Sequence, residues 1–161
     1  MNTIHEILKK PIKLVLENNI HEDVVFPDTT IAELVNKIHA KVTDPDLEVY
    51  LSALFVYTDK SADNKYVPKA MITSREAIKF AELVTEHLDS GKHASEPISV
   101  LNLETHFPIK FQLSDSDEIE EATRIFKSGL TDVIIIVNST SEYIGKLKRE
   151  NFTEKLKMLL N

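Results

Sequence analysis

The stretch VIIIVNSTSEYIGKLKREN, residues 133–151, contains the pattern that decides the fold. Its first five residues are apolar and predict a short buried strand, and the polar residues 138–142 predict a turn. A second short strand and the start of a helix follow. That helix would open with Lys148 and Arg149, although Ser, Thr, Asp or Asn is preferred at a helix N-terminus. The two cations therefore need a physical explanation.

The first half of the chain has the same order of elements. Residues 24–26 predict a short strand, and Thr30 with Glu33 has the spacing of a capping box that opens a helix. Two apolar stretches, 51–57 and 66–72, predict strands, and the pair Thr73 and Glu76 opens the next helix in the same way. The apolar faces expected for these helices are Ile31, Leu34, Val35 and Ile38 in the first, and Ala77, Ile78, Ala81, Val84 and Leu88 in the second.

The two halves form an internal repeat. Val25, Ile31 and Leu34 match Leu113, Ile119 and Ala122 at a constant offset of 88, and Thr73 matches Lys148 at an offset of 75. Each half reads strand, helix, strand, strand, helix, which predicts an α/β (α+β) fold. A capping-box spacing at Thr3 and Glu6 adds a short helix near residues 3–10. We expect one repeat, with the N-terminal helix, in 1–90, and a linker with the second repeat in 91–161.

Composition excludes several classes of protein. The net charge of −7 over 161 residues argues against nucleic acid as a partner and gives no attraction to an anionic membrane. The absence of cysteine excludes disulfides, thiolate metal sites and cysteine nucleophiles. Neither a signal peptide nor a membrane span is expected, because no apolar run reaches the roughly 18 residues of a span. The expected location is the cytoplasm.

No catalytic residue or metal site is expected. The six histidines are scattered without ligand spacing, and the adjacent residues His21, Glu22 and Asp23 would point opposite ways on an extended segment. The acidic stretch DSDEIEE, 115–121, is typical of a first helical turn, where carboxylates favour the positive end of the dipole. Signatures of a serine nucleophile are absent from the sequence. The chain is therefore predicted not to be an enzyme.

The two strand-to-helix junctions are the candidate binding sites. Thr73 and Glu76 are explained by helix capping alone, which stabilises a helix by about 1 kcal/mol. Their hydroxyl and carboxylate could also hold the hydroxyls of a sugar. In the second half, Lys148 and Arg149 are each unfavourable by about 0.3–1 kcal/mol at the positive helix end, and a bound phosphate would reverse that sign. The alternative is that both cations point into solvent.

With this repeat and these junctions, the chain resembles a tandem pair of cystathionine-β-synthase (CBS) domains, or Bateman module, over about residues 12–160. The stretch 133–156 resembles the family's apolar strand, polar turn, glycine-containing second strand and closing helix, and FPDTTIAELVNKI resembles the opening of a first copy. The resemblance implies two β-α-β-β-α units packed about a pseudo-two-fold axis. It also implies an adenosine-containing ligand (AMP, ADP, ATP or S-adenosylmethionine) in the clefts between the units.

The family's ribose and phosphate contacts carry over to Thr73 and Glu76 in the first copy and to Lys148 and Asn151 in the second. Arg149 joins them as a candidate phosphate ligand, and the candidate apolar walls for the adenine are Val24, Phe26, Phe111 and Ile134. Both copies depart from the family motif. Ala70 and Glu76 replace glycine and aspartate in the first copy, and Lys148 and Asn151 replace threonine and aspartate in the second, where Gly145 is kept.

The resulting prediction is a regulatory module that senses an adenine nucleotide. The alternative is a ligand-free interaction module that kept the fold. Family members often dimerise through their closing helices, so a homodimer that buries the Leu156–Leu160 face is expected, together with a protein partner that receives the signal.

Overall fold

The computed structural model describes residues 3–16, 24–42, 53–60 and 66–161. The chain divides into two compact units, and unit 2 is inserted into the sequence of unit 1. Unit 1 consists of residues 1–22 and 110–161, and unit 2 of residues 23–109.

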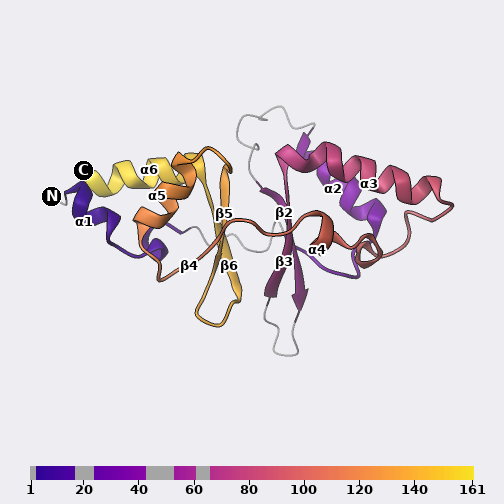
Figure 1. Ribbon diagram of the computed structural model, residues 1–161, viewed down its shortest axis with the longest axis horizontal. Coiled ribbons are helices and arrows are strands. Elements are labelled where there is room, and N and C mark those ends of the chain that lie inside the picture. Colours follow the sequence, from indigo (N-terminus) through magenta and orange to yellow (C-terminus); the bar gives the residue numbers. More distant parts are fainter. Residues whose placement is uncertain (1–2, 17–23, 43–52, 61–65) are drawn as a thin grey trace. The chain divides into compact units, whose positions relative to one another are not determined.

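Unit 2 is a three-stranded sheet with its helices on one face (Figure 1). Strand β1 (Val24–Val25) pairs in parallel with β2 (Ala53–Lys60), which pairs antiparallel with β3 (Tyr66–Thr73). The helical elements are α2 (Ile31–Val42), the 3-10 turn η3 (Ser74–Glu76), α3 (Ala77–Asp89), the 3-10 turn η4 (Ile98–Leu101) and α4 (Leu103–His106). Their shared core includes Val25, Ile31, Leu34, Ile72, Phe80, Ile98 and Phe107.

Unit 1 repeats this arrangement. Strand β4 (Gln112–Ser114) pairs in parallel with β5 (Val133–Val137), which pairs antiparallel with β6 (Tyr143–Lys148). The helical elements are α1 (Ile4–Leu8), the 3-10 turn η1 (Ile12–Leu14), α5 (Ile119–Lys127) and α6 (Arg149–Leu160). Their core includes Ile7, Ile12, Ile119, Phe126, Ile134 and Phe152. The predicted α+β class and the repeated order of strand, helix, strand, strand, helix are confirmed.

Two of the three expected capping boxes form as the spacing predicts. The hydroxyl of Thr3 accepts the N–H of Glu6 at 3.2 Å, and that of Thr30 accepts the N–H of Glu33 at 3.1 Å. The third differs, because the turn η3 intervenes and α3 begins only at Ala77. Its apolar face is rotated as well. Phe80 is buried in the core, whereas Ile78, expected on that face, is 76% exposed.

The short segment that precedes each repeat in sequence pairs with the other repeat. Pro11 forms a bridge with Glu118, ahead of α5, and Pro97 forms the matching bridge with Thr30, ahead of α2. The next residue in each case donates its N–H to the opposite strand, Ile12 to the Asp117 carbonyl at 2.8 Å and Ile98 to the Thr29 carbonyl at 2.7 Å. The two units therefore differ from a sequential division into 1–90 and 91–161: the described residues 3–16 belong to the unit of the second repeat, and residues 91–109 belong to the unit of the first.

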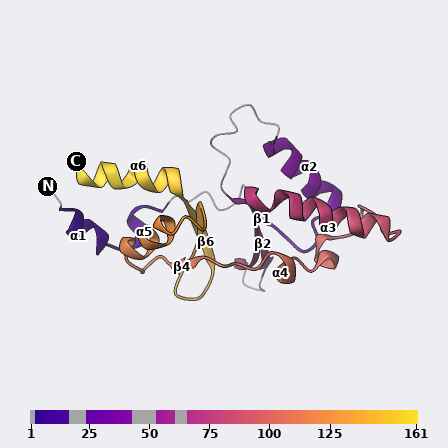
Figure 2. The same cartoon turned by 45° about the horizontal axis from the view of Figure 1, so that its top comes forward.

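Helix α1 covers part of the closing helix within unit 1, where both views place it beside α5 and α6 (Figures 1 and 2). Ile7 of α1 has no exposed surface, and Leu156, Leu159 and Leu160 of α6 pack in the same cluster. The leucine face that was expected to be buried by dimerisation is thus already half-buried inside the chain.

Candidate functional site

The junction between β3 and α3 brings together the first predicted pair. Thr73 is the last residue of β3 and is buried, and its hydroxyl donates a hydrogen bond to Oε1 of Glu76 at 3.0 Å. Glu76 ends the 3-10 turn directly before α3 and is half-buried. A hydroxyl and a carboxylate therefore lie together at the end of a strand. Because the hydroxyl proton is already donated to Glu76, the pair offers acceptor positions to a ligand.

The two apolar candidates of unit 2 lie on or directly after β1. Val24 is 7% exposed and precedes Val25, which lies in the core, so alternation along the strand points Val24 to the other face of the sheet. Phe26 is half-buried, and its ring centroid lies 5.5 Å from that of Tyr66 at the start of β3. Val24 therefore lies in the sheet whose strand β3 ends at Thr73, and Phe26 directly follows a strand of that sheet.

The junction between β6 and α6 contains Lys148, Arg149 and Asn151. Lys148 is the last residue of β6 and the N-cap of α6, is half-buried, and makes no side-chain capping bond. Asn151 lies in the first turn of α6 and is also half-buried. At the offset of 75, Lys148 and Asn151 occupy the places that Thr73 and Glu76 have in unit 2.

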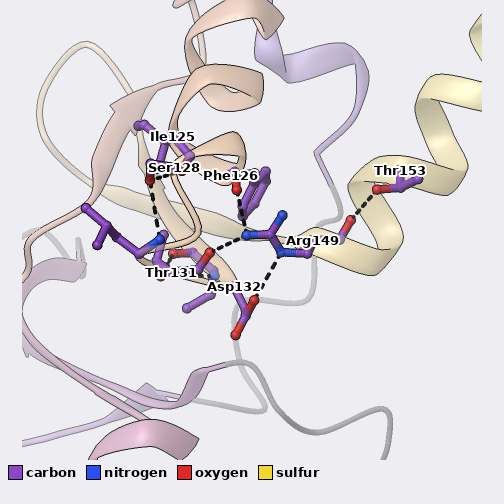
Figure 3. A network of polar contacts seen from close by, with 9 residues as sticks. Ile125, Phe126, Ser128, Thr131, Asp132, Arg149 and Thr153 are labelled. Carbon is purple, nitrogen blue, oxygen red and sulfur yellow. Dashed lines mark hydrogen bonds and ion pairs between the residues drawn. The ribbon is translucent and has the colours of Figure 1, made fainter.

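Arg149 is held by contacts inside unit 1 (Figure 3). Its Nε lies 3.0 Å from Oδ1 of Asp132, and its Nη2 donates to the carbonyls of Phe126 at 2.6 Å and Thr131 at 3.0 Å. The guanidinium carbon also lies 5.3 Å from the centre of the Phe126 ring.

These contacts explain why a cation is tolerated at the start of α6. The Asp132 carboxylate neutralises the guanidinium, and the carbonyl of Phe126 lies in the last turn of α5, where cations are favourable. The guanidinium thus connects the end of α5 to the start of α6, and its expected role as a phosphate ligand stays a prediction. The cation that is left to be explained at this junction is Lys148.

The two apolar candidates of unit 1 lie at or near its core. Ile134 has no exposed surface and packs in the cluster with Phe126, so it is a core residue, and its expected role as a wall for the adenine stays a prediction. Phe111 is half-buried against the same cluster. Ile135 alternates to the other face of β5 and pairs in register with Lys146.

Lys146 is a residue that the sequence analysis missed. It is 9% exposed, one of four buried polar or charged residues in the described part of the chain. It shares a strand with Lys148, two residues on, so period-two alternation places both ammonium groups on one side of β6. The signal was present in YIGKLK, because a lysine inside an otherwise apolar strand is unusual.

The described residues contain no group of three or more histidine, aspartate or glutamate side chains placed to hold a metal ion. Within the same residues, no helix combines the length and apolar character that crossing a bilayer requires.

Comparison with known proteins identifies the fold. No family model matches the chain, and no curated protein matches it. Among solved structures, CBSX2 in complex with AMP is 16% identical, with a TM-score of 0.62 and coverage of 94% of this chain and 99% of that one. The CBS domain of the bacterial CNNM/CorC family Mg²⁺ transporter in complex with ATP is 10% identical, with a TM-score of 0.57 and coverage of 96% and 92%. PAE2072 from Pyrobaculum aerophilum, complexed with AMP, is 15% identical, with a TM-score of 0.54 and coverage of 93% and 97%.

These neighbours share the fold at low sequence identity across almost the whole chain. The chain therefore has the fold of a CBS domain pair, and the resemblance inferred from its sequence is confirmed at the level of fold.

Proposed function

We propose that this chain is a non-enzymatic regulatory module that binds an adenosine-containing ligand, which is AMP, ADP, ATP or S-adenosylmethionine. The observation that carries the proposal is the fold, because solved structures of the same fold were obtained in complex with AMP or ATP. The ligand would reach the chain at one or both strand-to-helix junctions. There Thr73 and Glu76, or Lys148 and Asn151, present polar side chains at equivalent places in the two repeats.

Lys148 is the residue on which the phosphate part of the proposal depends. It stands at the N-terminus of α6, where the helix dipole favours an anion, while the backbone N–H of Arg149 is already donated to the Asp132 carbonyl. Its ammonium group adds a positive charge, and Lys146 on the same side of β6 adds another. In this proposal the affinity rises from AMP to ATP and falls with salt, because each added phosphate increases the electrostatic attraction.

A thermal-shift panel with AMP, ADP, ATP, S-adenosylmethionine and GTP tests the proposal. A ligand present at about 100 times its Kd stabilises the folded state by about 2.7 kcal/mol. For a chain of this size that raises the unfolding midpoint by about 5–10 °C. A rise with at least one adenine ligand and none with GTP is the expected result. A panel in which no ligand moves the midpoint would refute adenine nucleotide binding.

The matched variants are Lys148→Glu and Lys157→Glu. Lys148→Glu should abolish the shift by ATP and leave the unfolding midpoint of the free protein within about 2 °C of wild type. Lys157→Glu makes the same charge change at an exposed residue in the last turn of α6, at the far end of the helix from the junction, and should leave the shift by ATP intact. Equal losses in both variants would mean that net charge, and not a site at Lys148, governs binding.

A second candidate is an interaction module that binds no nucleotide. The observation that favours it is the saturation of two polar groups by the chain itself: Glu76 already accepts the Thr73 hydroxyl, and Arg149 is already paired with Asp132. A flat thermal-shift panel would select this candidate.

The downstream partner of either module is another protein or a second copy of this chain. Sedimentation velocity, with and without the ligand that raises the unfolding midpoint in the thermal-shift panel, tests whether the chain forms a homodimer. The expected result is a dimer whose stability changes with ligand, and a ligand-independent monomer at all concentrations would contradict it.

A further inference from the structure

The sheet of unit 1 has one face that is turned away from the helices of that unit. Leu113 of β4 and Leu147 of β6 pack in the core cluster, so the residue before each of them points to the opposite face. Those residues are Gln112 and Lys146, and both lie in register with Ile135 on the intervening strand β5. Gln112, Ile135 and Lys146 therefore form a row across the three strands, here called the unit-1 row.

An equivalent row, here called the unit-2 row, crosses the sheet of unit 2. It consists of Val24, Val56 and Met71, which lie in register on β1, β2 and β3. Val24 corresponds to Gln112 at the offset of 88, and Met71 corresponds to Lys146 at the offset of 75. Val24 and Met71 are apolar and buried, with 7% and 4% of their surface exposed. The two ends of the row are therefore apolar in unit 2 and polar in unit 1.

The difference between the units continues toward the closing helices. Lys148 lies two residues after Lys146 on the same face of β6, and the residue in the equivalent place after Met71 is Thr73. The strand β6 thus carries two ammonium groups where β3 carries a thioether and a hydroxyl. Unit 2 also has the carboxylate of Glu76, whose Oε1 lies 3.0 Å from that hydroxyl. This face of unit 1 is therefore more positive than the equivalent face of unit 2.

One pair of equivalent residues has charges of the opposite sign. Arg75 of unit 2 corresponds to Glu150 of unit 1, and both are exposed. Charges that are in contact with water are screened. Lys146 is only 9% exposed, and a charge in an environment of low dielectric constant acts more strongly on a neighbouring ionic group. Lys146 therefore contributes more to the electrostatics of its face than either exposed residue does.

The candidate ligands differ in the sign of their charge. AMP, ADP and ATP carry negative phosphates, whereas S-adenosylmethionine has no phosphate and carries a positive sulfonium group. Two ammonium groups on one face attract the phosphorylated ligands and repel the sulfonium. The unit-2 row contains no charged residue, so it does not discriminate between these ligands by charge.

We propose that Lys146 makes the junction of unit 1 selective for phosphorylated nucleotides and excludes S-adenosylmethionine from it. The inference rests on the proposed function, because it concerns the choice among the adenosine-containing ligands named there. Lys148 attracts the phosphates at the start of α6, and Lys146 extends the positive charge along β6. The junction of unit 2, where Met71 has the place of Lys146, lacks this selectivity.

Isothermal titration calorimetry on the full chain with ATP, AMP and S-adenosylmethionine tests the proposal. The variant is Lys146→Met, which installs the residue that unit 2 has at this place and keeps an unbranched, flexible side chain. The Kd for ATP should rise about tenfold or more, and the Kd for S-adenosylmethionine should stay the same or fall. The salt dependence of ATP binding should weaken, because one charge is lost. ¹H–¹⁵N chemical-shift changes at Lys148 and Asn151 assign the binding to unit 1.

Two further variants are the controls. Lys157 is 66% exposed in the last turn of α6, so Lys157→Met removes the same charge at the far end of that helix and should leave every Kd unchanged. Lys146→Arg keeps the charge and should keep the preference for ATP over S-adenosylmethionine. If Lys146→Met does not fold, Lys146→Gln removes the charge with a polar side chain and serves the same test.

Three results would overturn the proposal. Equal weakening of ATP and S-adenosylmethionine in Lys146→Met would mean that Lys146 supports the packing of the sheet and not the choice of ligand. Binding of ATP with an unchanged ratio of the two Kd values would refute this inference and leave the proposed function standing. The absence of binding of every adenine ligand to the wild-type chain would refute both.

Discussion

The side chain and the backbone of Arg149 both bind Asp132. Its Nε lies 3.0 Å from Oδ1 of Asp132, and its backbone N–H donates to the carbonyl of the same residue at 2.9 Å. Asp132 directly precedes β5, and Arg149 is the first residue of α6. This pair therefore connects the start of β5 to the helix that follows β6. Two further bonds to the carbonyls of Phe126 and Thr131 extend the connection to the end of α5.

Replacement of Arg149 by alanine is expected to destabilise unit 1. The change removes an ion pair, two hydrogen bonds to carbonyls and a contact with the Phe126 ring. Because the side chain is about a third exposed, part of the electrostatic term is screened, and we expect a loss of about 1–3 kcal/mol in urea unfolding. Lysine at this position should not restore stability, because it lacks the planar fork that makes several bonds at once.

Arg124 is the control for this prediction. It pairs with Glu120 and Glu121 on the surface of α5 and is 66% exposed, so Arg124→Ala should change the stability by about 0.5 kcal/mol or less. If Arg149→Ala instead left stability unchanged and reduced nucleotide affinity, Arg149 would be a ligand-binding residue after all.

Replacement of Ile7 by alanine tests the assignment of α1 to unit 1. Ile7 has no exposed surface and packs with Phe126, Ile134 and Phe152, so the smaller side chain leaves a cavity. We expect a loss of about 2–5 kcal/mol. Native-state hydrogen exchange should place this loss in α5, β5 and α6, with α2 and α3 less affected.

Ile4→Ala is the matched change on the same helix. Ile4 is 50% exposed, so its truncation should cost about 1 kcal/mol or less. Equal effects of the two changes, or a loss of protection centred on α2 and α3, would contradict the assignment.

Replacement of Thr73 by valine separates a capping role from a binding role. Valine keeps the shape and removes the hydroxyl that donates to Glu76, which should destabilise the fold by about 1 kcal/mol. If the hydroxyl also contacts a ligand, calorimetry should report an affinity about tenfold lower for the adenine ligand identified in the thermal-shift panel.

Thr123→Val provides the comparison for Thr73→Val. The Thr123 hydroxyl donates to the Ile119 carbonyl one turn back in α5, so its loss should alter stability slightly and ligand affinity not at all. An unchanged affinity in Thr73→Val would limit Thr73 to its structural contact with Glu76.

The acid side of the stability curve should depend on Glu96. The backbone N–H of His93 donates to its Oε1 at 3.0 Å and is the main cause that lowers the pKa of this carboxyl below its ordinary value of 4.5, with the charges of His87 and Lys92 acting in the same direction. A carboxyl whose pKa is lowered by folding stabilises the folded state at pH values above its unfolded pKa. That contribution is lost as the pH falls from about 4.5 through the lowered value.

Glu96→Gln should therefore flatten the dependence of unfolding free energy on pH below about pH 4.5, while at neutral pH the variant should be less stable than wild type. Urea unfolding from pH 3 to pH 7 measures both effects. Glu82→Gln, at an exposed position on α3, is the control and should run parallel to wild type. A Glu96→Gln curve parallel to wild type would rule out the proposed linkage.

Much of the fold was predictable because its signals are local. The capping hydrogen bonds at Thr3 and Thr30 join residues three apart, so sequence spacing is enough to specify them. The strand 133–137 and the turn after it were also correct, since a short apolar run between polar residues has few alternatives. The face of α3 was misjudged, because Ile78 and Phe80 are both apolar and only the position of the sheet decides which one is buried.

The candidate site was predictable in its location and less so in its contacts. Sequence placed Thr73, Glu76, Lys148 and Asn151 at the two strand-to-helix junctions, where the structure has them. It could not assign Arg149, because the partners of its side chain lie 17 to 23 residues away in sequence. It could not tell which face of β5 carries Ile134, since alternation tells which strand residues share a face and leaves open which face is the core.

The sequence by itself determined the order of elements, the repeat and the helix starts, because those depend on hydrogen bonds and apolar spacing within a few residues. Tertiary structure alone decided that α1 packs with the second repeat and that Asp132 neutralises Arg149. It also decided that η1 belongs to the unit of the second repeat and η4 to the unit of the first. These features join residues far apart in the chain, and the free energy that selects them comes from burial and charge pairing that exist only after the chain has folded.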